Sequence, residues 1–410
     1  MTANHREPGP TSESERSGVP IFEQDARYGR LEDVRAHLNR AAWLDGPGYW
    51  IAIAVLGALS IAALVSLAMV LTSGPASRAK WAYTAAAVAF LFSSAQAAPV
   101  LAFTTRRSRG YWGIPVRRAA ELLSIAGLVS APLVVLLLMQ LPPDHGDHGF
   151  WFNWPGAPLV WDGLAVALLS VLGVVLVYVS SLPDLAARRD RHAPTSSLAL
   201  GWSGTVRQWR VLNAGVTTLG ALYFALYAYV HLLVVTDLAV SLVPEWHSAV
   251  LPLHHAVTGL QGGVAATLLV MALLRHFGQQ QHFFGRDTFH ETGKLLLILS
   301  TFYFYFIWSE LLPLWYWRTP PAIWTLGLFM FGPYLAVFAV SLACAFVIPF
   351  LMLLYNPIRD SVAGTTIAAG IALVGVYADR VRLYVPSWSF TGPLVPRGPE
   401  MLASRPLPPT

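Results

Sequence analysis

Charged residues are scarce in this sequence. Lys, Arg, Asp and Glu make up 12% of its 410 residues, and hydrophobic residues make up 55%. A soluble domain carries roughly 25% charged residues, so the composition excludes an ordinary soluble enzyme. The mean hydropathy of +0.53 also predicts a polytopic membrane protein. The sequence pI near 9.4 comes from basic residues in short loops between apolar runs, so no nucleic-acid partner is expected.

Cysteine is nearly absent, since Cys344 is the only one. A single thiol excludes a disulfide framework, a thiolate zinc site and an iron–sulfur cluster held by this chain alone. We therefore expect no metal site on this chain, and expect any redox metal to be a haem or to belong to a partner. No cleavable signal peptide is expected, because the first apolar run begins near Trp50 and is long enough to span a membrane.

Long apolar runs are abundant, and nine of them reach the roughly 20 residues that a membrane-spanning helix needs. They predict an all-α polytopic membrane protein with two up-down four-helix bundles and a flanking helix. The first bundle is expected in residues 46–200 and the second in 201–385, between a flexible cytoplasmic tail (1–45) and a Pro-rich outer tail (386–410). The predicted spans are 50–72, 81–104, 118–141, 158–182, 211–236, 247–274, 292–316, 331–354 and 361–384.

The distribution of Lys and Arg predicts the orientation of these spans. Basic residues are concentrated in the tail before the first span and in the connections 2–3, 4–5 and 6–7, whereas the connections 3–4 and 5–6 have none. Basic connections stay in the cytoplasm. We therefore expect a bacterial cytoplasmic membrane protein with its N-terminus in the cytoplasm and its C-terminus outside.

The stretch from Asp237 to His255 joins two of the spans and contains two acids and three histidines but no Lys or Arg. Ionisable groups at a membrane boundary are costly unless they are paired, hydrated or used in proton chemistry. His247 and His254 are two helical turns apart and are predicted to share one stripe. Asp237, His254 and His255 are therefore candidates for proton transfer, and His247 is a candidate for binding a quinone.

Two other roles for these histidines stay open. An interfacial histidine can simply be satisfied by backbone or lipid head groups. Haem ligation would need His231 facing His254 or His255, and the second such pair that a two-haem site requires is absent. We therefore expect no haem on this chain.

A second candidate site lies in the seventh predicted span. Glu310 follows the aromatic residues Tyr303, Tyr305 and Trp308. An aromatic belt at the membrane interface explains tryptophans and tyrosines, but it does not require an acid. Glu310 is therefore a candidate for accepting a proton, and Tyr303, Tyr305 and Trp308 are candidates for lining a slot for a flat quinone ring.

Two motifs resemble those of a known family, the NrfD-like (polysulfide-reductase-type) membrane subunits. One is Asp237-Leu-Ala-Val-Ser241-Leu-Val-Pro244-Glu-Trp246-His247-Ser248. The other begins at Gly293-Lys294-Leu295 and continues through Ser309-Glu310 and Trp315-Tyr316 to Pro320. The chain is most similar to the shorter membrane subunit of quinol:cytochrome c oxidoreductases of the alternative complex III type, although Glu245 departs from the family motif.

The resemblance implies a function and a set of partners. It implies a membrane subunit that supports the binding of menaquinol or ubiquinol near the outer face. Electrons are expected to pass to an Fe–S cluster subunit and cytochrome c subunits, next to a paralogous membrane subunit. Two other functions remain open: a proton-coupled secondary transporter, and a purely structural membrane anchor of a redox complex. Membrane lipid is a partner in each case.

Overall fold

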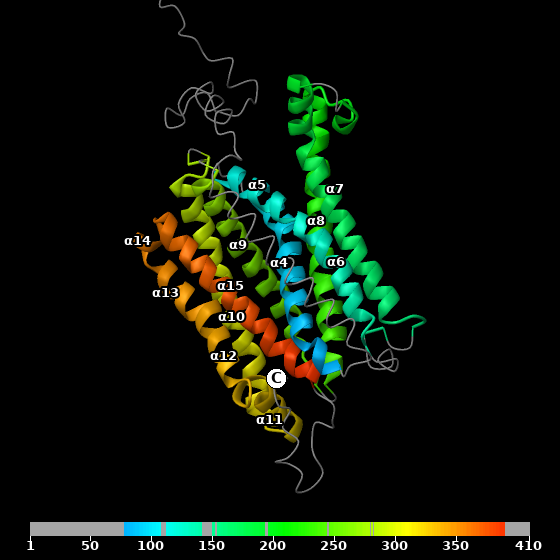
Figure 1. Cartoon of the computed structure of the whole chain (residues 1–410), viewed down its shortest axis with the longest axis vertical. Coiled ribbons are helices and arrows are strands. Elements are labelled where there is room, and N and C mark those ends of the chain that lie inside the picture. Colours follow the sequence, from blue (N-terminus) through cyan, green and yellow to red (C-terminus); the bar gives the residue numbers. More distant parts are fainter. Residues whose placement is uncertain are drawn as a thin grey trace, which may run out of the picture.

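The computed structural model of the protein describes residues 78–107, 112–141, 150–151, 154–192, 196–243, 246–278, 280–281 and 283–389. The tail 1–45, the first predicted span 50–72 and residues 390–410 lie outside the described residues. The described residues are helical and contain no strand, which confirms the predicted all-α class (Figure 1).

The helices follow one another in an up-and-down order (Figure 1). The longer ones are α4 (Ala82–Arg107), α5 (Gly113–Leu123), α6 (Ile125–Leu138), α7 (Leu159–His192), α8 (Val206–Leu238), α9 (Leu251–His276), α10 (Arg286–Trp317) and α15 (Val362–Ser389). The region between α10 and α15 is divided into α11 (Pro320–Leu326), α12 (Leu335–Leu342), α13 (Ile348–Leu354) and α14 (Asn356–Arg359), with the π-helical segments η6 (Gly327–Phe331) and η7 (Ala343–Val347). Short 3-10 helices are η2 (Arg78–Trp81), η4 (Ser196–Ala199) and η5 (Val240–Leu242).

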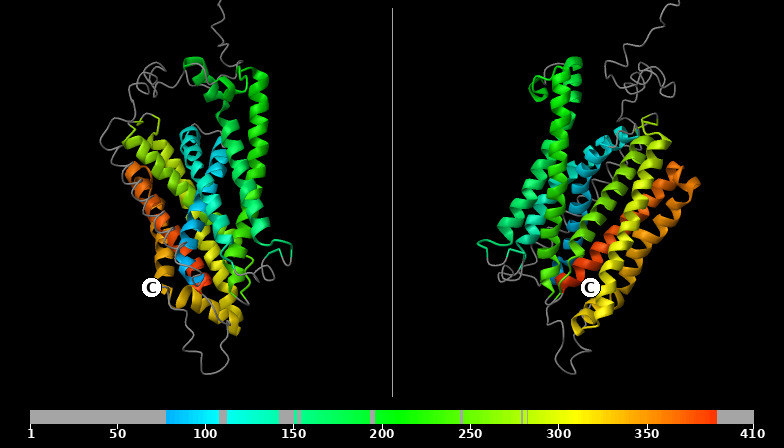
Figure 2. Two further views of the ribbon diagram at one scale, coloured as in Figure 1. Left: turned by 45° about the vertical axis from the view of Figure 1, so that its right-hand side comes forward. Right: turned by 180° about the vertical axis from the view of Figure 1, so that it is seen from behind.

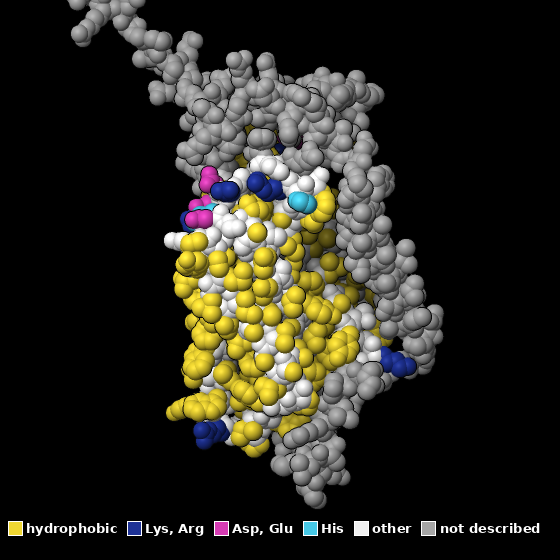
Figure 3. Space-filling model, turned by 60° about the vertical axis from the view of Figure 1, so that its left-hand side comes forward, with side chains coloured by type: hydrophobic (Ala, Val, Ile, Leu, Met, Phe, Trp, Pro, Cys, Tyr) yellow, Lys and Arg dark blue, Asp and Glu magenta, His cyan; other side chains and the backbone are white. Residues whose placement is uncertain are grey.

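Eight helical segments among the described residues are long and apolar enough to cross a membrane. They coincide with the eight predicted spans after the first. In Figure 3, the middle of the displayed face is covered by hydrophobic side chains, and charged side chains gather near its ends. The hydrocarbon core of a membrane offers no hydrogen-bond partners to backbone N–H and C=O groups. A continuous helix satisfies these groups within the span itself.

The eighth predicted span is interrupted at its beginning. The helical run from Pro320 ends at Phe331, and α12 begins at Leu335. Gly332 leaves the helical conformation with φ −102° and ψ −132°, and Pro333 has no amide hydrogen to continue the helix. The helical path is therefore broken at Gly332-Pro333.

Three helices form the centre of the fold. Helices α4, α9 and α15 pack against one another, and they lie side by side in every view (Figure 2). Their close approach depends on glycines in α9: a Cβ at Gly263 would lie 2.6 Å from the Cβ of Ala97. Small residues such as Gly263 allow α9 and α4 to pack closely.

Candidate functional site

The C-terminal part of α15 is buried on all sides. Each residue from Ala378 to Trp388 is buried, because α4, α9, α10 and α12 pack around this helix. This region lies at the end of the bundle where α8, α10 and α15 end and α9 begins, which we call the acid–histidine end. The opposite end, where α4 and α7 end, is called the arginine-rich end. The buried part of α15 contains three charged residues, namely Asp379, Arg380 and Arg382.

Asp379 is the centre of a buried ion-pair network. Its Oδ1 accepts hydrogen bonds from Arg382 Nη2 at 2.9 Å and Nε at 3.2 Å. Its Oδ2 accepts one from Arg380 Nη1 at 3.1 Å. The hydroxyl of Tyr303 on α10 donates to Oδ1 at 3.4 Å. Buried charges persist only when they are paired and hydrogen-bonded in this way.

His254 and Glu310 join this network from two other helices. His254, in the first turn of α9, places its Nε2 3.5 Å from Asp379 Oδ2. Its ring meets the ring of Tyr303 edge to face, with the centroids 5.3 Å apart. Glu310 on α10 lies close enough to Arg382, His254 and Asp379 for charge interactions. Side chains from three helices, α9, α10 and α15, therefore meet around Asp379.

His254 and Glu310 have hydrogen-bonding capacity that is not used. Their exposed fractions are only 1% and 6%. Neither ring nitrogen of His254 has a hydrogen-bond partner among the described residues, and the same holds for Oε2 of Glu310. Buried polar atoms usually have a partner, so such atoms require an explanation. They are the positions in the network where a proton or a polar ligand atom can be accepted.

A second group of side chains continues the network toward α4 and α8. His255 Nε2 and the hydroxyl of Tyr384 are hydrogen-bonded at 3.0 Å. Arg380 Nη2 donates to the carbonyl of His255 at 2.9 Å and to Ser93 Oγ at 3.3 Å. The ring of His231 lies 5.3 Å from that of His255, between centroids. Both neighbouring histidines of α9 are therefore held by α15.

Asp237 belongs to a separate acidic pair at the same end of the bundle. Its carboxyl group lies within hydrogen-bonding reach of that of Asp162, in the first turn of α7. Asp237 Oδ1 accepts from the backbone N–H of Phe150 at 2.6 Å. Asp162 Oδ1 accepts from the indole N–H of Trp151, also at 2.6 Å. Two adjacent buried carboxyl groups repel each other unless they share a proton.

Comparison with known proteins identifies the family of this arrangement. A search of curated protein sequences gives no match. The family model described as polysulphide reductase, NrfD, matches residues 50–392. This chain belongs to the NrfD family. NrfD-family proteins are membrane subunits of quinone-linked oxidoreductases and partner with Fe–S subunits in membrane redox complexes. The predicted resemblance to this family is confirmed.

The structure of this NrfD-family chain brings together half of the sequence-predicted site residues. Four of them, His254, His255, Tyr303 and Glu310, contribute to the network around Asp379 and Arg380. Asp237 lies in the separate pair with Asp162. Tyr305 and Trp308 are exposed on the opposite side of α10, with exposed fractions of 58% and 49%. A quinone-binding role for them stays a prediction.

His247 lies outside the helix in which the sequence placed it. Helix α9 begins at Leu251, and His247 is exposed. The prediction that His247 and His254 share one helical stripe is therefore wrong. The physical reason is Pro252 in the first turn: proline is favoured at the start of a helix, where its missing N–H would have no partner.

Sequence reasoning missed the centre of the NrfD-family network. None of Asp379, Arg380, Arg382 and Tyr384 was among the sequence-predicted site residues. A signal was present, because three charged residues stand within four positions in a predicted span. Charges inside a span mark a functional site by default. Their partners lie on other helices, and only the fold identifies them.

Proposed function

We propose that this chain is the quinol-binding and proton-accepting membrane subunit of a quinol:electron-acceptor oxidoreductase of the alternative complex III type. The observation that carries the proposal is the convergence of His254, Tyr303 and Glu310 on the Asp379 ion-pair network. The unpartnered atoms of His254 and Glu310 suit the needs of quinol oxidation, which releases protons together with electrons. Both residues are buried, and each has side-chain atoms without a hydrogen-bond partner among the described residues.

The charges of the network suit it to accept a proton. Arg380 and Arg382 together carry two positive charges, and Asp379 and Glu310 carry two negative charges when ionised, so the ionised network is neutral. A proton taken up by Glu310 or His254 adds one positive charge in a buried, low-dielectric site. That charge favours onward release of the proton, as a transfer relay requires. General acid–base transfer by such a group contributes about 10²–10⁴-fold to a rate.

Quinol is proposed to reach the site from the lipid phase along α10. Its polar ring would hydrogen-bond His254 and Glu310, and Tyr303 would fix the neighbouring carboxylate of Asp379. Tyr305 and Trp308 face outward on the same helix, and they are proposed to contact the apolar tail of the quinol. His247, exposed before α9, is proposed to contribute at the mouth of this site. The quinone is menaquinone or ubiquinone, and the chain needs no haem or cluster of its own for this role.

Protons are proposed to leave through the pair Asp237 and Asp162. The pair lies at the same end of the bundle as the Asp379 network. Trp388, one turn after Tyr384 on α15, donates its indole N–H to the carbonyl of Leu238 at 2.8 Å. This contact holds the end of α15 next to the residue that follows Asp237. The distribution of Lys and Arg supports the placement of this end at the outer face of a bacterial cytoplasmic membrane.

Electrons are proposed to pass to centres on partner chains. These are an Fe–S cluster subunit and cytochrome c subunits, next to a paralogous membrane subunit. Purification in a mild detergent followed by mass spectrometry tests this set of partners. Co-purification with cluster- and haem-bearing chains is the expected result. A chain that purifies alone and transports a solute would instead favour a secondary transporter.

The proton-accepting role is tested with single variants of the intact complex. Glu310→Gln and His254→Gln are expected to lower quinol oxidation by about 10²–10⁴-fold. Asp237→Asn is expected to lower it as well. Glu291→Gln is the matched control, because Glu291 lies on α10 near the arginine-rich end and pairs with Lys294 at 2.7 Å. Full activity in Glu310→Gln, His254→Gln and Asp237→Asn would refute the proposal and favour a structural anchor.

A further inference from the structure

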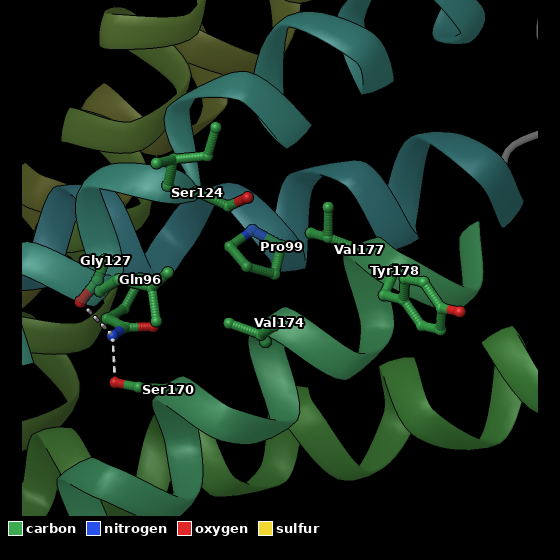
Figure 4. A pocket seen from close by; sticks show the side chains of 11 residues that line it. Gln96, Pro99, Ser124, Gly127, Ser170, Val174, Val177 and Tyr178 are labelled. Atoms are coloured by element: carbon green, nitrogen blue, oxygen red, sulfur yellow. Dashed lines mark hydrogen bonds between the residues drawn. The ribbon is translucent and has the colours of Figure 1, made fainter. Parts of the chain in front are cut away.

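A cavity of about 180 Å³ lies between α4, α6 and α7, away from the acid–histidine end (Figure 4). Its lining is mostly apolar. The one amide in its wall, Gln96, is already satisfied, since its Nε2 donates to Ser170 Oγ at 2.9 Å and to the carbonyl of Gly127 at 3.3 Å. Leu128 and Val174 line the cavity and are also exposed on the membrane-facing surface. The cavity is therefore an apolar groove that opens toward lipid.

The groove continues toward the arginine-rich end. A second, smaller cavity shares Pro99 and Val177 with the first and extends to Arg106, Glu121 and Ser180. These three polar residues are connected: Ser180 Oγ donates to Glu121 Oε1 at 2.7 Å, and Arg106 Nη1 donates to Ser180 Oγ at 3.3 Å. An apolar groove thus ends in a charged cluster, as a lipid site between spans would.

The charged cluster carries a net positive charge. Arg118 pairs with Glu121 at 2.7 Å and also with Asp184. Arg117 Nε lies 3.8 Å from Glu121 Oε1. Arg106 is close enough to Arg117 for electrostatic repulsion between the two guanidinium groups. Three guanidinium groups therefore share two carboxylates. The Nε of Arg117 is buried and has no hydrogen-bond partner among the described residues. The cluster therefore has one positive charge more than its two carboxylates can match.

We propose that this groove binds an anionic phospholipid. One acyl chain would lie along the apolar wall between α6 and α7, and the head-group phosphate would be bound at Arg106, which lines the groove, by the excess positive charge of Arg106, Arg117 and Arg118. Basic pockets between spans at a membrane surface bind anionic head groups in this way. The site is separate from the Glu310 network, so it adds a lipid requirement that the proposed redox function does not need.

Charge complementarity selects this occupant over two others. A quinone ring would need hydrogen-bond partners in the groove, and the amide of Gln96 is already engaged there. A further segment of this chain, such as the predicted span 50–72, has no acidic residue to match the arginines. An anionic phospholipid supplies both apolar acyl chains and a negatively charged head group.

The first test measures lipid affinity of the purified full chain, or of its complex, in mild detergent. Phosphatidylglycerol is expected to raise the thermal midpoint more than phosphatidylcholine does. Arg117→Gln is expected to weaken the apparent affinity for phosphatidylglycerol about fivefold, the equivalent of about 1 kcal/mol for one basic residue. Arg286→Gln, which removes an exposed arginine at the start of α10, is the control and should leave the affinity unchanged.

The second test fills the groove. Val174→Trp places a large side chain in the cavity and is expected to remove the copurifying anionic lipid that mass spectrometry detects. Val171→Trp is the matched control, because Val171 is exposed one turn away on α7 and does not line the cavity. Equal effects of both lipids, or full lipid retention in Val174→Trp and Arg117→Gln, would overturn the proposal. So would loss of quinone instead of phospholipid from Val174→Trp.

Discussion

His254 and Asp379 meet across two helices, with His254 Nε2 3.5 Å from Asp379 Oδ2 and both side chains only 1% exposed. This contact joins the beginning of α9 to the buried part of α15. Arg380 and Arg382 form ion pairs with the same carboxylate, and Glu310 Oε2 is buried without a hydrogen-bond partner among the described residues. Asp379 is held by the two arginines, whereas His254 turns its Nε2 toward that carboxylate and its Nδ1 has no hydrogen-bond partner among the described residues. In the proposed function, Asp379 fixes the network and His254 accepts a proton.

Removal of the charge of Asp379 is expected to destabilise the protein strongly. Asp379→Asn leaves the buried guanidinium groups of Arg380 and Arg382 without their counter-ion. The expected cost is about 3–5 kcal/mol, measured as a lowered thermal midpoint and a lowered yield from membranes. Asp360→Asn is the control: Asp360 pairs with His290 at an exposed position, and an exposed pair contributes about 0–1 kcal/mol. Equal stability of the two variants would show that the ion-pair network is not needed for folding.

Loss of the hydroxyl of Tyr384 is expected to leave His255 without a partner. The Nδ1 of His255 already has no hydrogen bond among the described residues, and its Nε2 is bonded to Tyr384 at 3.0 Å. Tyr384→Phe is therefore expected to cost about 1–3 kcal/mol of stability, measured by thermal unfolding in detergent. Tyr377→Phe on the same helix is the control, because Tyr377 is 38% exposed, and its effect should stay within roughly 0.5 kcal/mol. A Tyr384→Phe protein as stable as this control would contradict the expectation.

A methyl group at Gly263 is expected to push α9 away from α4. The added Cβ would lie 2.6 Å from Ala97 Cβ and 2.9 Å from the carbonyl oxygen of Ser94. Gly263→Ala is expected to cost about 1–3 kcal/mol, because a well-packed core cannot absorb the extra atom without shifting. Gly370→Ala provides the comparison within α15, since a Cβ there meets nothing within 4 Å. That variant should gain roughly 0.5–1 kcal/mol from helix propensity. Thermal unfolding of both variants measures the difference, and a stabilised Gly263→Ala would argue against the close approach.

The exposed aromatic side chains of α10 allow a test of the proposed quinol access from the lipid phase. Trp308→Ala removes an exposed side chain that is proposed to contact the tail of the quinol. The variant is expected to raise KM about fivefold, because the lost apolar contact contributes about 1 kcal/mol to binding. Its kcat is expected to stay unchanged. Tyr229→Ala is a control on α8, because Tyr229 is similarly exposed at 41%. A lowered kcat in Trp308→Ala would instead indicate that this residue helps to hold the reacting ring.

The sequence determined the membrane fold almost completely. Each predicted span from 81–104 onward lies on a membrane-length helix, because roughly 20 consecutive apolar residues have few alternatives in lipid. The break at Gly332-Pro333 and the close packing at Gly262-Gly263 follow from local backbone chemistry, because proline has no amide hydrogen and glycine has no side chain. The start of α9 was misplaced by four residues, because the preference of Pro252 for the first turn outweighed the apolar periodicity.

The tertiary structure alone decided which polar residues act together. Arg380 and the carbonyl of His255 are 125 residues apart in sequence, and Tyr303 and Asp379 are 76 apart, yet each pair is hydrogen-bonded. Hydropathy and helical spacing describe one helix at a time, so they placed Glu310, His254 and His255 at one end of the bundle but could not name their partner. The packing of α15 between α4, α9 and α10 supplies that partner. Burial then forces the charges of Asp379, Arg380 and Arg382 to pair, because a lone charge in that environment is too costly.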